Sequence, residues 1–456
     1  MAWRWTRGLS LYTEPSIHHV AAPYFPFYFM VLGWLYHLTG PAYWVGRLIS
    51  TASTLVSGIL TFWVVKQESR SLLLGLICSG IWFASFGHSG FFFDLNRVDS
   101  FSIVFLMAAY VIAFYKPGEI MGGLAGLFLA LSVLTKQNHL AFIAPILFSK
   151  LIQKDFRGAA ALTIVFAGVI FPFIIIYNRA SDGWFSLLTL KFIRFTIMPS
   201  RIFEFLSWYF KHYAIPTTII LAFIIKNLAE HRWKDVLRNP WLAFWAASFV
   251  LSFLFRLPPG GYLNAKMPIS LSTAVTVGVL LADLIGSQKE LKNRLITFPF
   301  VWPLAVAVVC IVAVLYMPFL SQIPAKSEWK AAKNLRKFVS SQQGLVVMPY
   351  HLIPEKNVLQ LHEISYHDLG NSDWGRKYHQ KIQEDLASLK PSMVIADADL
   401  RQIDAYKNLV EGMGHGIIDF ALKVKMVTGE KFSLQYVYYQ KHKRSDQSFS
   451  TSEMKQ

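Results

Sequence analysis

Apolar segments long enough to form membrane-spanning helices recur along the first 318 residues of the chain. We place ten of them, at residues 42–65, 71–90, 100–115, 119–135, 139–153, 159–177, 213–228, 240–256, 265–286 and 296–318. A helix needs about 20 apolar residues to cross the hydrocarbon core of a bilayer, and about 17 is the lower limit. Charged residues make up only 16% of the chain, whereas soluble proteins contain about 25%. The sequence therefore predicts an all-α multi-pass membrane bundle of about ten transmembrane helices.

Two shorter segments precede the first span. Residues 23–40 are apolar but short, begin with Pro23 and Pro26, and are rich in aromatic residues, so we expect an interfacial or re-entrant helix. Residues 1–22 are polar and aromatic and contain neither a signal peptide nor a membrane span. We expect them to form a loop, and the transmembrane domain to cover residues 41–319.

The composition changes after Pro324. A helix beginning near Ser327 is predicted by apolar residues at helical spacing, namely Trp329, Ala332, Leu335 and Val339. Further expected elements are a strand at 345–348, a helix at 378–389, a strand at 393–396, and a hairpin of residues 420–426 and 432–438. Residues 320–442 are therefore predicted to form a small soluble α/β domain, and residues 443–456 a disordered tail.

Positively charged residues are distributed unequally between the loops. One alternating set of loops holds thirteen Lys and Arg residues in about 40 positions, which is the pattern of cytoplasmic loops: Lys66, Arg70, Lys116, Lys150, Lys154, Arg157, Lys226, Arg232, Lys234, Arg238, Lys289, Lys292 and Arg294. We therefore expect a protein of the cytoplasmic (inner) membrane. Residues 1–22, the segment 94–99, the turn 135–139, the loops 178–212 and 256–266, and the C-terminal domain would share the outer face.

The net charge of +17 could indicate a nucleic-acid partner. However, 25 of the 44 Lys and Arg residues precede residue 320 and are scattered singly through loops. This distribution favours membrane lipids and phosphate groups as partners, with no nucleic acid. It does not determine an oligomeric state.

A charged segment with Asp94, Arg97 and Asp99 lies between two long apolar runs. Charges at the end of a membrane helix are costly unless they are hydrated or paired, so they are treated as functional by default. The two carboxylates could position an acceptor or a metal ion, or they could simply form ion pairs with Arg97.

Three lysine and arginine residues on the same face are candidates for binding a phosphate group. Lys136 interrupts an apolar hairpin within the polar run 136–139, although an interface lysine that extends toward lipid headgroups is the alternative. Arg256 and Lys266 flank another outer loop, and membrane anchoring is equally compatible with their positions.

The sequence contains no recognisable metal site. Both cysteines, Cys78 and Cys310, fall inside apolar runs. His18 and His19 are adjacent, so they point in different directions on a regular backbone, and no further ligands at suitable spacing surround them. No cofactor is predicted, and participation of a divalent metal ion is left open.

The order of several outer-loop motifs resembles that of GT-C glycosyltransferases. The closest group is family 39, which includes the protein mannosyltransferases and the bacterial lipid A aminoarabinose transferase. The resemblance covers roughly residues 1–285 and is carried by the segments 8–15, 24–28, 46–48, 97–100, 134–137 and 260–264. It implies an inverting hexosyl- or pentosyltransferase that uses a polyprenyl-phosphate sugar and an extracytoplasmic acceptor, which could be a lipid, a glycan or a protein.

The resemblance also implies roles for particular residues. Asp99, and Asp94 beside it, would belong to the catalytic site. Lys136, Arg97, Arg256 and Lys266 would bind the donor phosphate, and Tyr24, Gln137 and Asn264 would contact substrate. In the family, an early Asp of the first outer loop is the general base, but the only carboxylate of this loop here is Glu14, which lies after the expected position.

Family relatives begin with a cytoplasmic N-terminus and one span before this loop, whereas Met1 lies within the aromatic and basic stretch that follows the base. We therefore expect the chain to be truncated at its N-terminus, with the general base upstream of Met1 and Glu14 as the fallback. The alternative to an enzyme is a polysaccharide or lipid transporter, or a membrane scaffold. A transporter would be expected to have broken or polar helices at mid-membrane and an internal repeat, and neither is evident in the sequence.

Overall fold

The computed structural model describes residues 1–19, 21, 23–191, 197–258, 261–286, 326–349, 358–361, 375–396, 399–402, 407, 409–425 and 431–440. The chain divides into two compact units. The first contains Met1–Leu11, Tyr24–Thr189 and Ile193–Pro318, and the second contains Tyr12–Pro23, Leu190–Phe192 and Phe319–Gln456. The segment before α2 is thus divided between the two units.

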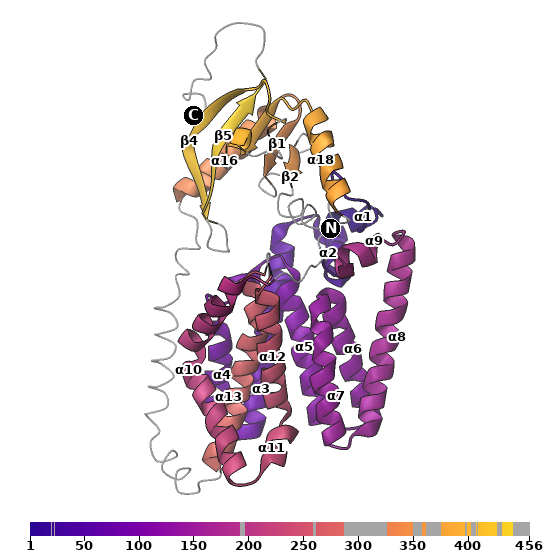
Figure 1. Ribbon diagram of the computed structural model, residues 1–456, viewed down its shortest axis with the longest axis vertical. Helices are drawn as coiled ribbons and strands as arrows, with labels where there is room; N and C mark the ends of the chain where they lie inside the picture. The colour runs from indigo at the N-terminus through magenta and orange to yellow at the C-terminus, as the bar shows by residue number, and fades with distance from the viewer. Residues whose placement is uncertain are drawn as a thin grey trace. The chain divides into compact units, whose positions relative to one another are not determined.

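The first unit is a bundle of helices that run side by side (Figure 1). Its α-helices are α1 (Ala2–Thr6), α2 (Phe27–Thr39), α3 (Tyr43–Ser69), α4 (Leu72–Ala84), α5 (Val98–Tyr115), α6 (Glu119–Thr135), α7 (Ile143–Ile152), α8 (Phe156–Ala180), α9 (Trp184–Ser186), α10 (Pro199–Ala229), α11 (Trp233–Arg238), α12 (Pro240–Arg256) and α13 (Met267–Gly286). Short turns η1 (Phe92–Asp94), η2 (Gln137–Phe142), η3 (Leu187–Lys191) and η4 (Leu263–Lys266) connect some of them.

Five helical segments of the described chain are long and apolar enough to cross a membrane: Tyr43–Ser69, Val98–Tyr115, Phe156–Ala180, Pro199–Ala229 and Leu263–Leu284. Three shorter apolar helices, α4, α6 and α12, accompany them. The predicted spans at 71–90 and 139–153 are longer than the helices found there, since α4 ends at Ala84 and α7 begins only at Ile143. The predicted span at 296–318 lies outside the described residues.

The prediction of a long loop at 178–212 is wrong. Helix α8 continues to Ala180, and α10 begins at Pro199, well before the expected span at 213–228. Proline at the first position of α10 is compatible with helix, because that position needs no N–H donor. The backbone departs from helical geometry at Tyr213, so the expected span forms only the second part of a kinked helix.

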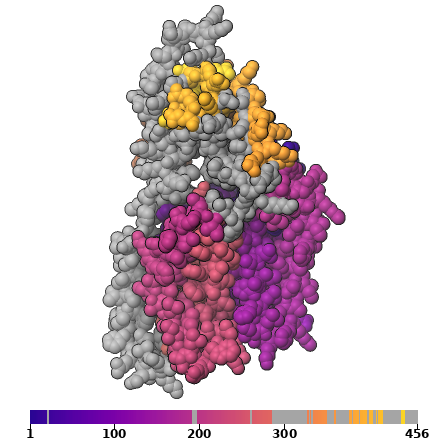
Figure 2. Space-filling model, viewed as in Figure 1, coloured from indigo at the N-terminus to yellow at the C-terminus, as the bar shows by residue number. Residues whose placement is uncertain are grey.

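Small residues allow close approach of helices α6 and α8. A Cβ atom added at Gly122 would overlap the backbone of Gly158, and one added at Gly126 would overlap the backbone of Leu162. The two glycines of α6 are four residues apart, which is the spacing that brings membrane helices into backbone contact. The outer surface of the bundle, one side of which Figure 2 shows, carries exposed apolar side chains such as Ile164 and Ile215, as expected for contact with lipid.

The second unit contains a five-stranded mixed sheet with the strand order β2-β1-β3-β5-β4. The strands are β1 (Val346–Pro349), β2 (Val358–Leu361), β3 (Met393–Ala396), β4 (Gly414–Lys425) and β5 (Lys431–Tyr439). Strand β1 pairs in parallel with β2 and β3, and β5 is antiparallel to β3 and β4. The predicted strands at 345–348 and 393–396 and the predicted hairpin are confirmed, whereas β2 was not predicted.

One helix covers each face of this sheet. Helix α16 (Lys326–Ser341) packs Leu335 and Val339 on the face formed by Val346 and Met348, and α18 (Arg376–Ser388) packs on the opposite face. Ile17, from the Tyr12–Pro23 segment of the same unit, joins the core on the α18 side. Both predicted helices are confirmed, but Trp329 is 63% exposed, so its expected place on the apolar face of α16 is wrong. The predicted disordered tail lies outside the described residues.

Candidate active site

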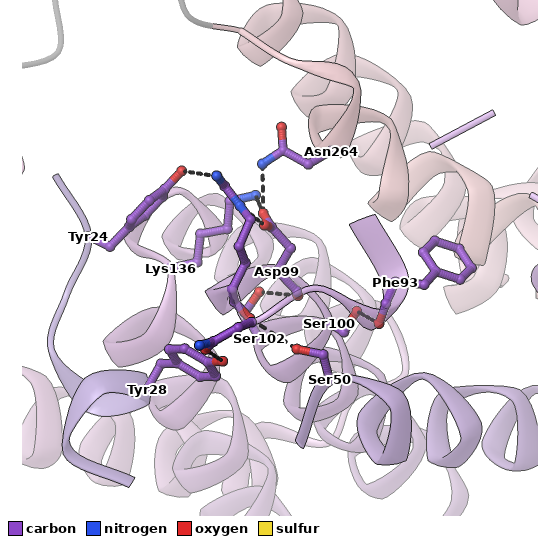
Figure 3. A network of polar contacts seen from close by, with 11 residues as sticks. Tyr24, Tyr28, Ser50, Phe93, Asp99, Ser100, Ser102, Lys136 and Asn264 are labelled. Atoms are coloured by element: carbon purple, nitrogen blue, oxygen red, sulfur yellow. Dashed lines mark hydrogen bonds and ion pairs between the residues drawn. The ribbon is translucent and has the colours of Figure 1, made fainter. Parts of the chain in front are cut away.

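Asp99 is the centre of a buried polar network at the start of α5 (Figure 3). Its carboxylate is only 1% exposed. Oδ1 accepts hydrogen bonds from Lys136 Nζ at 2.6 Å and from Asn264 Nδ2 at 2.7 Å, while Oδ2 accepts one from Arg97 Nε at 3.1 Å. Arg97 Nη2 also donates to the hydroxyl of Tyr24 at 3.1 Å. Five residues singled out in the sequence therefore meet at one place.

Three separate chain segments hold Asp99 and its direct hydrogen-bond partners. Arg97 is the extended residue before α5, and Asp99 lies in the first helical turn, where a negative charge is favoured by the helix dipole. Lys136 directly follows α6, at the point where the backbone becomes extended. Asn264 lies on the turn η4, before α13. The network thus joins the ends of three helices.

A second hydrogen bond braces the same region. The hydroxyl of Tyr28 on α2 donates to Asn96 Oδ1 at 2.7 Å, one residue before Arg97. The neighbouring Gln137 donates from Nε2 to the backbone oxygen of Thr189 at 3.0 Å. Gln137 therefore links the Lys136 turn to the segment after α9.

Asp94 and Asp99 have different partners and different environments. Asp94 forms an ion pair with Arg47 of α3. The Asp94 side chain is 31% exposed and that of Arg47 is 58% exposed, whereas Asp99 is almost completely buried. Of the two carboxylates considered as partners of Arg97, the structure pairs only Asp99 with it.

The candidate phosphate-binding residues form two groups rather than one. Arg256 at the end of α12 donates to the carboxylate of Glu204 and to the backbone oxygen of Gly261. Lys266 is only 2% exposed, and its ammonium lies 4.2 Å from the centre of the Trp208 ring. Among the ion pairs of the described residues, none joins Lys266 to a carboxylate; Glu204 acts on its ammonium only from a distance and is itself paired with Arg256.

Two histidines lie close to Lys266. The ring centres of His88, in the turn after α4, and His212, on α10, are 3.8 Å apart. Burial, together with the nearby charges of His212 and Lys266, lowers the pKa of His88 to about 4. His88 is therefore neutral at pH 7 and leaves the positive charge of this group on Lys266 and Arg256.

The sequence did not identify Glu204, Trp208 and His212 as partners of these cations. They are spaced four residues apart on α10 and therefore lie along one helix face. The same spacing can be read in the sequence. It places residues on one face only if the segment is helical, and this segment was expected to be a loop.

Glu14 belongs to the second unit. Its carboxylate lies 3.7 Å from Lys381 Nζ, and both side chains are about half exposed. Among the residues that the structure describes, no group of three or more His, Cys, Asp or Glu side chains could hold a metal ion.

No family model matches the sequence, and no curated protein is detectably similar to it. Among solved structures, the chain is similar to ArnT from Cupriavidus metallidurans bound to undecaprenyl phosphate. The TM-score is 0.58 and the sequence identity 11%, over 96% of this chain and 91% of that chain. The apo form of the same protein matches with a TM-score of 0.54 and 11% identity, over 91% and 87% of the two chains.

An identity this low establishes a shared fold and leaves the activity open. The match extends over nearly the whole chain, including both the bundle and the small domain with its mixed sheet. This protein is accordingly a multi-pass membrane protein with the GT-C-like fold, consisting of an all-α bundle and a small C-terminal α/β domain.

Proposed function

We propose that this protein is an inverting membrane glycosyltransferase that transfers a hexose or pentose from a polyprenyl-phosphate donor to an extracytoplasmic lipid, glycan or protein. The observation that carries the proposal is the buried ammonium of Lys266, which forms no ion pair with a carboxylate among the described residues. The nearby carboxylate of Glu204 is paired with Arg256, so one carboxylate serves two cations. A buried charge that is only partly compensated is costly, and an anionic ligand beside it reduces that cost. The match to a structure bound to undecaprenyl phosphate supports a polyprenyl phosphate as this ligand.

The chemistry fits the two groups of cations. Transfer breaks the bond between the anomeric carbon and the phosphate oxygen, so negative charge develops on the departing polyprenyl phosphate, and nearby cations stabilise it. Lys266 and Arg256 are proposed as its main partners. Lys136 and Arg97 already bind Asp99, and we propose that they complete the phosphate site while Asp99 holds them in place.

Neither Asp94 nor Asp99 is proposed as the base that deprotonates the acceptor. Three donors hold the carboxylate of Asp99, which leaves it little freedom to accept a proton, and Asp94 is paired with Arg47. Glu14 is the remaining carboxylate of the first outer loop in this chain, and its replacement by Gln tests it directly. Tyr24, Gln137 and Asn264 are proposed to contact substrate. The protein would lie in the inner membrane, with the active site and the small domain on the outer face.

The test uses the full chain in lipid nanodiscs with a radiolabelled polyprenyl-phosphate sugar. Cell-envelope extract is added as the source of acceptor, and the expected result is release of free polyprenyl phosphate together with transfer of the labelled sugar to that acceptor. Lys266→Met should weaken donor binding by about 10- to 100-fold, because a hydrogen bond to a charged group contributes about 1.5–3 kcal/mol. Lys234→Met is the matched control, since Lys234 is exposed on α11 and its ammonium lies 5.7 Å from the centre of the Trp233 ring.

Equal donor binding by the Lys266→Met variant and the wild type would contradict the assignment of the phosphate site. In sealed proteoliposomes, movement of the intact donor across the membrane without release of polyprenyl phosphate would instead support the alternative of a transporter. Absence of both donor binding and transport would favour a scaffold.

A further inference from the structure

Helix α16 has one face that is fully occupied by the sheet. Leu335 is 2% exposed and Val339 is completely buried, and both pack on β1, β3 and β5. The half-buried Phe338 extends the same contact. The buried face of α16 is therefore defined by the core of the small domain.

Four lysines form a stripe on the opposite face of α16. Lys326, Lys330, Lys333 and Lys337 are spaced by four, three and four residues, and all are exposed. At about 100° of rotation per residue, these positions fall within about 60° of arc, on the side of the helix away from Leu335 and Val339. We refer to these four residues as the lysine stripe.

The lysine stripe lacks the compensation found on the other helix of the domain. Among the side chains that the structure describes, which do not include that of Glu328, none is a carboxylate paired with any of the four ammonium groups. On α18, by contrast, Lys381 lies beside Glu14, and Glu384 falls on the same helix face as Lys377 and Lys381. An ordinary solvated helix face carries mixed charges, as α18 does, whereas the lysine stripe presents one sign only.

A tryptophan borders the stripe. Trp329 is 63% exposed, and Lys333 Nζ lies 5.9 Å from the centre of its ring. An exposed Trp beside lysines is typical of helices that lie at a membrane surface, where the ring enters the headgroup region and the amines meet anionic lipids. Leaving such a ring in water has no benefit for folding.

We propose that the lysine stripe and Trp329 bind the surface of a bilayer that contains anionic phospholipids. The helix begins at residue 326, shortly after the apolar segment 296–318. Because α16 belongs to the same chain as the membrane bundle, it meets lipid headgroups at a raised effective concentration. Each Lys near an anionic surface contributes attraction, so four together form a strong patch. This inference is independent of the proposed transferase activity.

The test measures contact between α16 and lipid in the full-length protein. A bimane fluorophore is attached at Ser340→Cys, which is exposed on α16 and leaves every lysine in place, in a background with Cys78→Ser and Cys310→Ser. The protein is reconstituted in nanodiscs that contain lipids with a nitroxide headgroup as quencher. Ser388→Cys, exposed on α18, is the matched control position.

Quenching at residue 340 should increase about twofold or more when anionic phosphatidylglycerol replaces part of the zwitterionic lipid. The increase should disappear in about 1 M salt, where the screening length falls to about 3 Å. Quenching at residue 388 should remain low in both lipids.

Charge-reversed variants distinguish an effect of the lysine stripe from an effect of the net charge of the protein. Lys330→Glu, Lys333→Glu and Lys337→Glu together should abolish the increase. Lys377→Glu, Lys390→Glu and Lys407→Glu change the net charge equally, at exposed positions outside α16, and should preserve it. Because reversal could disturb folding, Gln at the same three positions is tested in parallel and should reduce the increase at unchanged thermal stability.

Equal quenching in anionic and zwitterionic bilayers would overturn the proposal. The same conclusion would follow if both charge-reversed proteins lost the increase to the same extent, since net charge alone would then explain it. Binding of soluble polyanions without any lipid contact would show that the stripe serves a different partner, and would also overturn it.

Discussion

The carboxylate of Asp99 and the ammonium of Lys136 lie 2.6 Å apart, although the two residues belong to the start of α5 and the end of α6. Both side chains are less than a tenth exposed. The pair therefore ties two helix ends together in a place where neither charge can be satisfied by water. Arg97 is the second cation that pairs with Asp99, so the group of Asp99, Lys136 and Arg97 carries a net positive charge.

Breaking this pair from either side should destabilise the protein. Loss of one partner of a buried ion pair costs about 3–5 kcal/mol, and Asp99→Asn should have the larger effect because it leaves both Lys136 and Arg97 without a carboxylate. The double variant Asp99→Asn with Lys136→Met should lose less stability than the sum of the single variants. Thermal unfolding in detergent measures all three. Strictly additive effects would show that the two residues do not interact.

Asp94→Asn should have a much smaller effect than Asp99→Asn. The Asp94–Arg47 pair is partly exposed to solvent, and such pairs contribute about 0–1 kcal/mol. Arg47→Gln should match Asp94→Asn in unfolding midpoint, and both variants should retain sugar transfer. If Asp94→Asn eliminates transfer while the fold stays intact, Asp94 acts in the reaction itself.

Gly46 should not tolerate a larger residue. A Cβ atom at this position would overlap the side chain of Asn96 and approach the Tyr28 hydroxyl to 2.8 Å, which disrupts the hydrogen bond between them. Gly46→Ala should therefore lower the free energy of unfolding by about 1–3 kcal/mol, as overpacking does. Gly80 on α4 is the control, because nothing lies within 4 Å of its added Cβ. Gly80→Ala should be neutral or stabilise by about 0.5–1 kcal/mol; equal losses from both changes would refute the packing argument.

The predicted orientation can be tested by cysteine labelling in cells. Thr39, Asp182, Gln67 and His231 are exposed positions at helix ends. In a background without Cys78 and Cys310, an impermeant thiol reagent added from outside should label Thr39→Cys and Asp182→Cys. It should label Gln67→Cys and His231→Cys only after the membrane is permeabilised, because the basic loops are expected inside. Labelling of Gln67→Cys in intact cells would reverse the assignment of the outer face.

Protonation of Asp399 at acidic pH should reduce the protection of the small domain against amide hydrogen exchange. Hydrogen bonds from Arg401 and Tyr438 lower the pKa of Asp399. The unfolded chain has an Asp pKa of about 3.9. Because the pKa of Asp399 is lower than this in the folded protein, its ionised form stabilises the fold at every pH above about 3.9. This contribution to the free energy of unfolding is lost as the pH falls from about 3.9 through the folded pKa. Asp399→Asn should therefore speed hydrogen exchange in β3 relative to the wild type at pH 7, and the difference should shrink below about pH 3. A constant difference at every pH would show that the charge of Asp399 is not involved.

Local patterns in the sequence determined much of the fold. Apolar length and helical spacing located α12 and α16, and alternation located the β4–β5 hairpin, because these signals depend only on neighbouring residues. The same reasoning missed the first half of α10, where charged and aromatic residues at helical spacing lack the apolar run of a membrane span. It also placed Trp329 in a core, since spacing cannot distinguish a side chain facing the sheet from one facing solvent.

The sequence determined which residues belong to the candidate site, but it did not determine which of them contact one another. Asp99, Arg97 and Lys136 were selected because a charge beside an apolar run is costly, and that cost can be read from the sequence alone. Only the tertiary structure decided that Asn264 donates to Asp99 and that Arg97 donates to Tyr24. It also decided that Asp94 pairs with Arg47, and that Lys266 lies against Trp208 rather than beside Asp99. These pairings join residues up to 165 positions apart. Such contacts depend on how the helices pack, and helix packing is set by the whole bundle rather than by any one segment.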